Sequence, residues 1–223
     1  SKAVSKEEQQ TMIEYAENML EFAKTSLQVF KDVVLSNEEY MKIVLNKDLY
    51  YHETYHMGLV NDKNQFEVHD GKVRVVDQKG NEKEKYDAYD YLDHIAEASE
   101  PWTYEKFPYL RNPGYKGLVD GADSGLYRAS PLSRLNTCDS MPTPIAQEAL
   151  EEYRGILKDN GVDGPCQFTL CTHWARIIEM VCCAEKCLED VKNNDILNGD
   201  IKQHDLVPGG RGVGCVEAPR GTL

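Results

Sequence analysis

Two long stretches with apolar residues at every third or fourth position constrain this chain most. Residues 5–35 show this spacing, and Ser5 with Glu8 has the spacing of a helix capping box. In residues 167–193 apolar side chains cover much of the helical circumference, which is typical of a helix buried in a bundle. These two segments predict long helices, the second of them buried in a bundle.

Shorter helices are predicted beside the long ones. Ser36 with Glu39 repeats the capping signal, so helices should occupy 5–46. Asp87 can cap a helix over 87–99, which ends before a proline. Thr143 followed by proline has the order typical of a helix start, so helices are also expected over 143–193.

The segment 57–86 has the pattern of a small antiparallel β meander. Asp70-Gly71 is a two-residue hairpin signal between 66–69 and 72–76, and Lys79-Gly80-Asn81 is a second turn signal. So small a sheet needs a helix against one face. The fold class predicted is therefore mainly α (α+β), a bundle of long helices with a small antiparallel β meander.

Residues 101–142 are rich in proline and glycine and show little periodicity, so we expect a long loop. Its aromatic side chains indicate that it is ordered rather than a free linker. The tail 208–223 is irregular and glycine-rich. We treat 1–223 as one domain.

The chain is acidic, with a formal net charge of −13 spread along its length. It has no basic stripe, which argues against nucleic acid and anionic membrane surfaces as partners. No apolar run reaches the roughly 18 residues that a membrane helix needs, so no membrane insertion is expected. With 41% hydrophobic and 28% charged residues, the composition is that of a folded globular protein.

The seven cysteines suggest buried thiols in a reducing compartment, and no pair of them has Cys-x-x-Cys spacing. They are Cys138, Cys166, Cys171, Cys182, Cys183, Cys187 and Cys215. His173 lies two residues after Cys171, so a Cys/His metal site is an alternative to the core interpretation. Helical periodicity favours the core, and we predict no metal ligands in this chain.

Two other polar groups invite a functional interpretation. His52 and His56 are four residues apart with Glu53 between them, one residue more than the zinc-protease spacing, and no third ligand is evident. His173, Arg176 and Glu179 are three residues apart. We interpret these three structurally, as an Arg176–Glu179 pair within one helix and a histidine satisfied in the core.

The glycines of the tail do not form a phosphate loop, because no buried strand precedes them and no helix follows. Gly221 allows close backbone approach, Pro219 fixes a kink and Arg220 supplies a planar cation, a combination that suits a charged ligand. An exposed loop arginine is the structural alternative.

The tail sequence Glu217-Ala218-Pro219-Arg220-Gly221 resembles a motif of the large (alpha, catalytic) subunits of nickel-iron hydrogenases. Other segments resemble the family in the same order and spacing, and the likeness covers essentially the whole chain. These segments are Asp120 to Arg128, Pro131 to Asn136, Thr143 to Ala146 and His173 to Glu179. The likeness is strongest to the cytoplasmic methyl-viologen-reducing and NAD-linked group, which implies a cytoplasmic location.

The resemblance implies reversible oxidation of dihydrogen to protons and electrons at a nickel-iron centre. The family holds that centre with two Cys-x-x-Cys pairs, and neither pair occurs here. We therefore expect an internal fragment of such a protein, inactive alone and with no cofactor bound. The partners implied are further electron-transfer subunits and an iron-sulfur small subunit.

By the same resemblance, Arg220 is the candidate catalytic residue, with Pro219, Ala218 and Glu217 close to the metal site. Since arginine is essentially always protonated, we expect an electrostatic role. Two alternatives are a non-catalytic docking scaffold and a relative of the quinone-site subunit of respiratory complex I. The second has Pro-Lys-Gly where this chain has Pro219-Arg220-Gly221.

Overall fold

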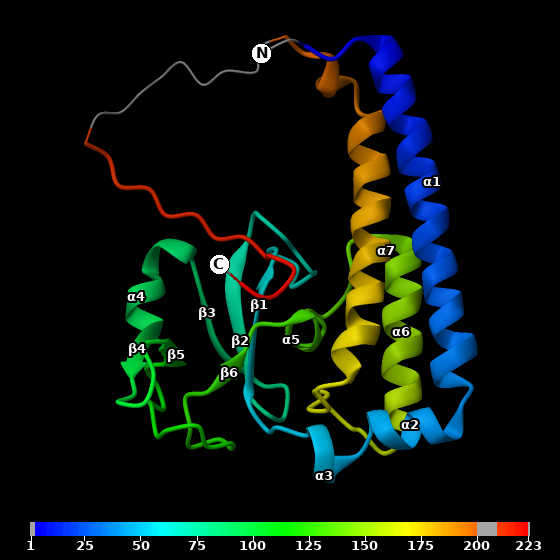
Figure 1. Ribbon diagram of the computed structural model, residues 1–223. Coiled ribbons are helices and arrows are strands. Elements are labelled where there is room, and N and C mark those ends of the chain that lie inside the picture. The colour runs from blue at the N-terminus through cyan, green and yellow to red at the C-terminus, as the bar shows by residue number, and fades with distance from the viewer. Residues whose placement is uncertain (1–2, 200–208, 223) are drawn as a thin grey trace.

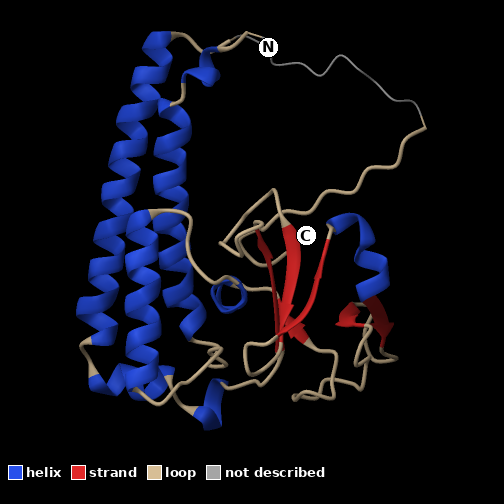
Figure 2. Cartoon of the chain, turned by 180° about the vertical axis from the view of Figure 1, so that it is seen from behind, coloured by secondary structure: helices blue, strands red, loops and turns tan. Residues whose placement is uncertain are grey.

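The computed structural model describes residues 3–199 and 209–222, and its elements lie in successive layers. Long helices form one side, the short helix α5 (Pro131–Thr137) lies next to them, and a four-stranded sheet follows (Figures 1 and 2). A β hairpin and a short helix lie beyond the sheet. This is the α+β architecture predicted, with helices predominating.

Helix α1 (Lys6–Phe30) begins at the predicted capping box, in which Ser5 and Glu8 bond reciprocally. It continues as a π-helical turn over Lys31–Leu35. The next helix, α2 (Glu38–Val44), is capped by Asn37 rather than by Ser36, because the Asn37 side chain accepts the first free N–H groups. The short helix α3 (Lys47–Tyr50) follows.

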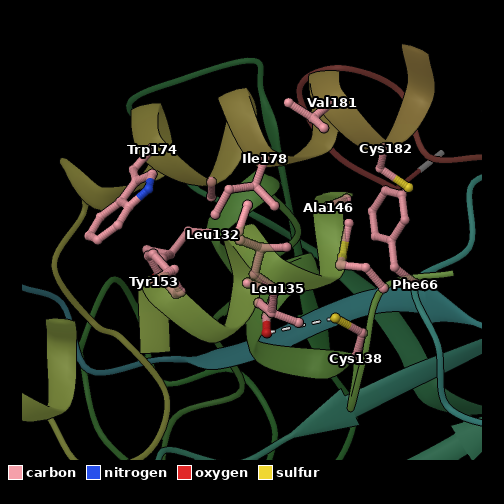
Figure 3. Close-up of a cluster of buried hydrophobic side chains, with 14 of the residues drawn as sticks. Phe66, Leu132, Leu135, Cys138, Ala146, Tyr153, Trp174, Ile178, Val181 and Cys182 are labelled. Carbon is pink, nitrogen blue, oxygen red and sulfur yellow. Dashed lines mark hydrogen bonds between the residues drawn. The ribbon is translucent and has the colours of Figure 1, made fainter. Parts of the chain in front are cut away.

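The main core lies where α5, α6 (Pro144–Asp159) and α7 (Cys171–Lys192) meet (Figure 3). α1 packs along α7, so the two periodic segments lie side by side. Trp174 and Tyr153 meet edge to face, with ring centroids 4.8 Å apart. The 3-10 turn Asn194–Leu197 follows α7. Among the helices described, none combines the length and apolar character needed to cross a membrane.

The sheet has the order β3-β2-β1-β6, with β1 (Tyr55–Val60), β2 (Lys72–Val76) and β3 (Glu82–Tyr86) as an antiparallel meander. β6 (Tyr127–Arg128) pairs parallel to β1. The strand predicted over 66–69 is wrong, because β2 pairs with β1 instead. Asp70-Gly71 therefore ends a longer connection, whereas the turn at Lys79-Gly80-Asn81 joins β2 to β3 as predicted.

β1 is buried along its whole length because both of its faces are covered. Tyr55, Met57 and Leu59 face a second core on the far side of the sheet. On the other face, a Cβ at Gly58 would lie 2.6 Å from the Thr137 hydroxyl of α5. Glycine at this position allows the helix to approach the strand closely.

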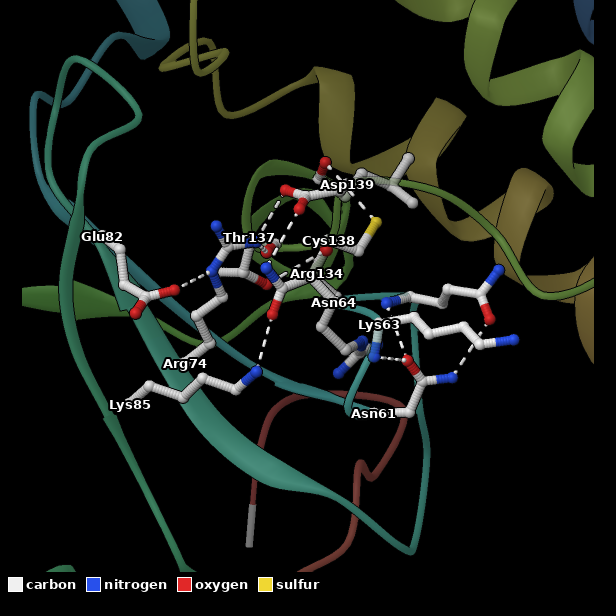
Figure 4. Close-up of polar contacts among 12 residues, drawn as sticks. Asn61, Lys63, Asn64, Arg74, Glu82, Lys85, Arg134, Thr137, Cys138 and Asp139 are labelled. Carbon is white, nitrogen blue, oxygen red and sulfur yellow. Dashed lines mark hydrogen bonds and ion pairs between the residues drawn. The ribbon is translucent and has the colours of Figure 1, made fainter.

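Arg74 of β2 ties the sheet to the end of α5 (Figure 4). Its Nη1 donates to the Thr137 carbonyl and to Asp139, each at 2.7 Å, and its Nε donates to Glu82 at 2.9 Å. Asp139 also accepts from Asn64 at 3.0 Å. The packing of α5 on the sheet is thus fixed by charge-assisted bonds as well as by apolar contact.

The helix predicted over 87–99 is wrong in its second half. A 3-10 turn (Ala88–Asp90) and α4 (Tyr91–His94) are followed by strand β4 (Ile95–Ser99), which pairs with β5 (Lys106–Leu110). The loop predicted over 101–142 is ordered, but it also contains β5, β6 and α5. Its proline-rich composition concealed these short elements because α5 begins at a proline, which suits a first helical turn.

Candidate functional site: the carboxyl-terminal turn and its buried anchor

The tail returns to the sheet as a tight turn. Ala218 and Gly221 exchange both backbone hydrogen bonds, at 2.9 and 3.2 Å, and Glu217 bridges Thr222. A Cβ at Gly221 would lie 3.0 Å from the Ala129 carbonyl, so the turn lies close against the segment before α5. Pro219 and Arg220 occupy the tip of the turn, where Arg220 is exposed. Residues 208 and 223 of the predicted tail lie outside the described residues.

Glu217 anchors this turn. Its side chain is 1% exposed, and its Oε1 accepts the Leu59 N–H at 2.6 Å. The Thr222 hydroxyl donates to both carboxylate oxygens, at 3.0 and 3.1 Å. The backbone N–H of Glu217 donates to the Val68 carbonyl at 2.6 Å. One residue thereby joins the tail to strand β1.

Arg134 of α5 is the cation of the anchor and is 3% exposed at its side chain. It binds both carboxylate oxygens of Glu179 on α7, through Nε at 2.5 Å and Nη2 at 2.9 Å. Its Nη1 donates to Glu217 and to the Ala218 carbonyl, both at 3.0 Å. The helix α7, the helix α5 and the tail meet at this one guanidinium.

The anchor holds one cation and two carboxylates, and this imbalance affects its electrostatics. Burial acts against the charged guanidinium, but the bonds and charges of Glu179 and Glu217 raise the pKa of Arg134 above its ordinary value. Burial raises the pKa of Glu217, against the lowering influence of Arg134 and of the Leu59 N–H. Arg134 therefore stays charged and neutralises only part of the buried negative charge.

The structure places Glu217, Ala218, Pro219 and Arg220 together, as their contiguity required, but in different roles. Glu217 and Ala218 bond inward to Arg134, while Arg220 faces solvent. Sequence reasoning missed Arg134, which is 45 residues from Glu179 and 83 from Glu217. No local spacing rule connects residues so far apart.

The histidine-containing groups differ from the predictions. Glu179 pairs with Arg134 and not with Arg176, and His173 is exposed rather than satisfied in the core. The reason is that α7 turns Glu179 toward α5 and leaves His173 on its open side. His52 lies 3.1 Å from Asp120, whereas His56 is fully buried beside Ser133 and Asn136, so these two histidines have separate partners.

Four cysteines are buried, and of these Cys171 and Cys182 lie in the periodic helix α7, as the periodicity indicated, whereas Cys183 is exposed. Within residues 3–199 and 209–222, no three His, Cys, Asp or Glu side chains gather in a way that could hold a metal ion.

Comparison with curated proteins finds hydrogenase subunits. The chain is 38% identical over its full length to the iron-sulfur subunit of the F420-non-reducing hydrogenase of Archaeoglobus profundus, of which it covers 45%. It is 39% identical over 97% of its length to a subunit of the F420-non-reducing hydrogenase of Methanothermobacter thermautotrophicus, covering 42% of that protein. Over 75% of its length it is 39% identical to the beta subunit of the NAD-reducing hydrogenase HoxS of Cupriavidus necator, covering 32%.

A solved structure of an NAD+-reducing nickel-iron hydrogenase in the H2-reduced state matches with a TM-score of 0.82. The two are 29% identical, and the match covers 100% of this chain and 46% of the other. No family model matches the chain. The chain thus spans less than half the length of these relatives.

The names of these relatives correct the predicted type of subunit. The sequence resemblance was to a large (alpha), nickel-carrying catalytic subunit, whereas one relative is named an iron-sulfur subunit and another is named a beta subunit. The descriptions of this chain as large, alpha and nickel-carrying are therefore set aside. What the comparisons establish is that the relatives of this chain are subunits of hydrogenases.

Proposed function

We propose that this chain is part of a subunit of a hydrogenase, and that it acts within a multi-subunit complex that interconverts dihydrogen with protons and electrons. The observation that carries this is the similarity to hydrogenase subunits along the whole chain. Seven free cysteines suit a reducing compartment such as the cytoplasm. The chain alone should not turn over hydrogen.

Within that complex, the anchor positions Arg220. The inward bonds of Glu217 fix the base of the turn, so the exposed guanidinium at its tip has a defined place relative to β1 and α5. Cleaving dihydrogen into a proton and a hydride creates separated charge. A preorganised cation near the reacting atoms lowers the energy of the negative species without needing to give up a proton. We assign this electrostatic role to Arg220.

The test is Arg220→Lys in the intact hydrogenase. Hydrogen oxidation should fall by orders of magnitude while assembly of the complex and its metal content stay normal, because lysine keeps the charge but loses the planar, two-pronged geometry. Arg176→Lys, at an exposed arginine of α7, is the matched control and should keep full activity. Wild-type activity in Arg220→Lys would refute the role, and metal loss would show a structural one.

A docking role is supported by a separate observation, an exposed apolar stripe on α1 and the π-helical turn that continues it. Its residues recur at helical spacing on one side of the helix and do not face α7. They are Tyr15, Met19, Phe22, Val29 and Val33, exposed by 71, 41, 67, 54 and 51% respectively. Contiguous exposed apolar surface of this kind marks an interaction site, and we propose that another component of the hydrogenase covers it.

Replacing Phe22 and Val29 together by serine should abolish co-purification of the chain with the other hydrogenase subunits. The isolated chain should keep its circular dichroism spectrum, since neither side chain contributes to the core. Tyr104→Ser, at a tyrosine that is 95% exposed and lies away from α1, serves as control. Undiminished co-purification of the double variant would exclude the stripe as the docking face.

A further inference from the structure

A cavity of about 400 Å³ lies on the far side of the sheet from the long helices, and Thr222 of the carboxyl-terminal turn borders it. Its floor is the sheet, including Met57 and Val73, and Tyr91 and Ile95 form a side wall. The glycine-rich tail segment 211–215 forms another wall. The volume is within the range of small-molecule sites, which are mostly apolar with a few polar groups.

Tyr86, one of the residues that line the cavity, carries a polar group that the described protein leaves unpaired. Tyr86 is only 5% exposed, and its hydroxyl has no hydrogen-bond partner within residues 3–199 and 209–222. The Tyr86 ring stacks on the His94 ring, with centroids 3.8 Å apart. His94 is held in turn by Glu84, whose Oε2 lies 2.9 Å from the His94 Nδ1. A buried hydroxyl without a partner costs free energy, so an acceptor at this place would be favoured.

The tail segment that lines the cavity carries a cation, Arg211. The Arg211 guanidinium lies over the Tyr89 ring, 5.4 Å from its centroid, and within the described residues no carboxylate is paired with it. Three tyrosines also line the cavity, Tyr86, Tyr91 and Tyr127. Aromatic walls favour an aromatic guest in stacked or edge contact, and an arginine favours a planar acid group.

We propose that this cavity binds a small aromatic acid, with its ring among the tyrosines and its carboxylate oxygens at the Tyr86 hydroxyl and at Arg211. The cavity shares Thr222 with the carboxyl-terminal turn, but the groups proposed to bind the acid are not part of the anchor, and the proposal does not depend on the hydrogenase role. The cavity wall itself provides a reporter, because the half-buried Cys215 lines the same cavity.

The experiment measures alkylation of the 223-residue chain by iodoacetamide with 2-naphthoate as the probe, followed by mass spectrometry of each cysteine. The probe should slow alkylation at Cys215 and leave the exposed Cys183, outside the cavity, unaffected. Tyr86→Phe and Arg211→Gln should each raise the half-protecting concentration on the order of tenfold, as expected for the loss of one bond to a charged group. The uncharged 2-naphthol should protect less.

The proposal fails if 2-naphthoate leaves the Cys215 rate unchanged, since the cavity would then hold only water. It also fails if both variants are protected at the wild-type concentration, because binding would not use the two polar groups. Should Tyr86→Phe disturb the second core, Arg211→Gln alone remains decisive, since Arg211 is exposed and packs in no core.

Discussion

Protonation of His56 should destabilise this protein well above the pH at which carboxylates titrate. His56 is fully buried in β1, with Nδ1 at 3.2 Å from the Ser133 hydroxyl and Nε2 at 3.2 Å from the Asn136 amide nitrogen. The Asn136 amide nitrogen can only donate, so Nε2 accepts and the proton sits on Nδ1. A second proton, on Nε2, would point at the amide N–H donor of Asn136 in a buried site.

The size of the effect follows from the pKa. Burial, reinforced by the charge of Arg128, lowers the pKa of His56 from 6.5 to about 3. A base whose pKa is lowered by folding contributes stability that is complete above pH 6.5 and is lost as the pH falls toward 3. The full difference corresponds to roughly 5 kcal/mol, and about 2 kcal/mol of it should disappear between about pH 7.5 and 5.

Urea unfolding followed by circular dichroism, repeated from about pH 7.5 to 5, measures this loss. His56→Gln removes the titrating ring. The free energy of unfolding of this variant should therefore change by about 2 kcal/mol less than that of the wild type over this pH range, even if the substitution lowers stability equally at every pH. His173→Gln, at an exposed histidine, should keep the wild-type slope. The reasoning is refuted if the His56→Gln and wild-type curves run parallel over this range.

Three further predictions concern packing and the anchor. Glu179→Ala should lower the free energy of unfolding by roughly 3–5 kcal/mol in urea titrations, because the buried Arg134 loses its two-pronged partner. Gly58→Ala should cost roughly 1–3 kcal/mol through overpacking against α5, whereas Gly155→Ala, facing open space in α6, should stabilise by roughly 0.5–1 kcal/mol. Glu217→Ala should cost about 1–3 kcal/mol, because the buried N–H of β1 loses its acceptor, and should speed proteolysis of the tail.

The helices were predictable because their signals are local. The capping box of α1, the proline after Thr143 and the apolar periodicity of α7 each lie within a few residues of the feature they determine. β4 was not predictable in this way. Ile95 and Ala96 fit one face of a helix equally well, and only pairing with Tyr109 and Leu110 of β5 makes them a strand.

In the candidate site, too, the part with a local sequence signal was predictable and the part that depends on distant residues was not. Arg220 was named by its motif and lies at the tip of the turn, but its support depends on residues distant in sequence. Even the Thr143 cap, found correctly at the start of α6, acts differently from the local rule. The Thr143 hydroxyl donates to Glu185 of α7, and that carboxylate accepts the first N–H groups of α6 in its place.

Charged residues of the conspicuous motifs are mostly engaged within the fold, and this sharpens what Arg220 can do. Arg128 donates to the His52 carbonyl and to Gln167, and Arg134 binds Glu179 and the tail. Guanidiniums engaged in this way cannot turn toward a ligand without leaving carboxylates and carbonyls unsatisfied. The Arg220 side chain can turn toward a ligand without leaving such groups unsatisfied, because Glu217, and not Arg220, holds the turn in place. A cation fixed through its neighbours can act on a reacting group while the fold stays unchanged, and for this reason the Arg220→Lys experiment separates chemistry from stability.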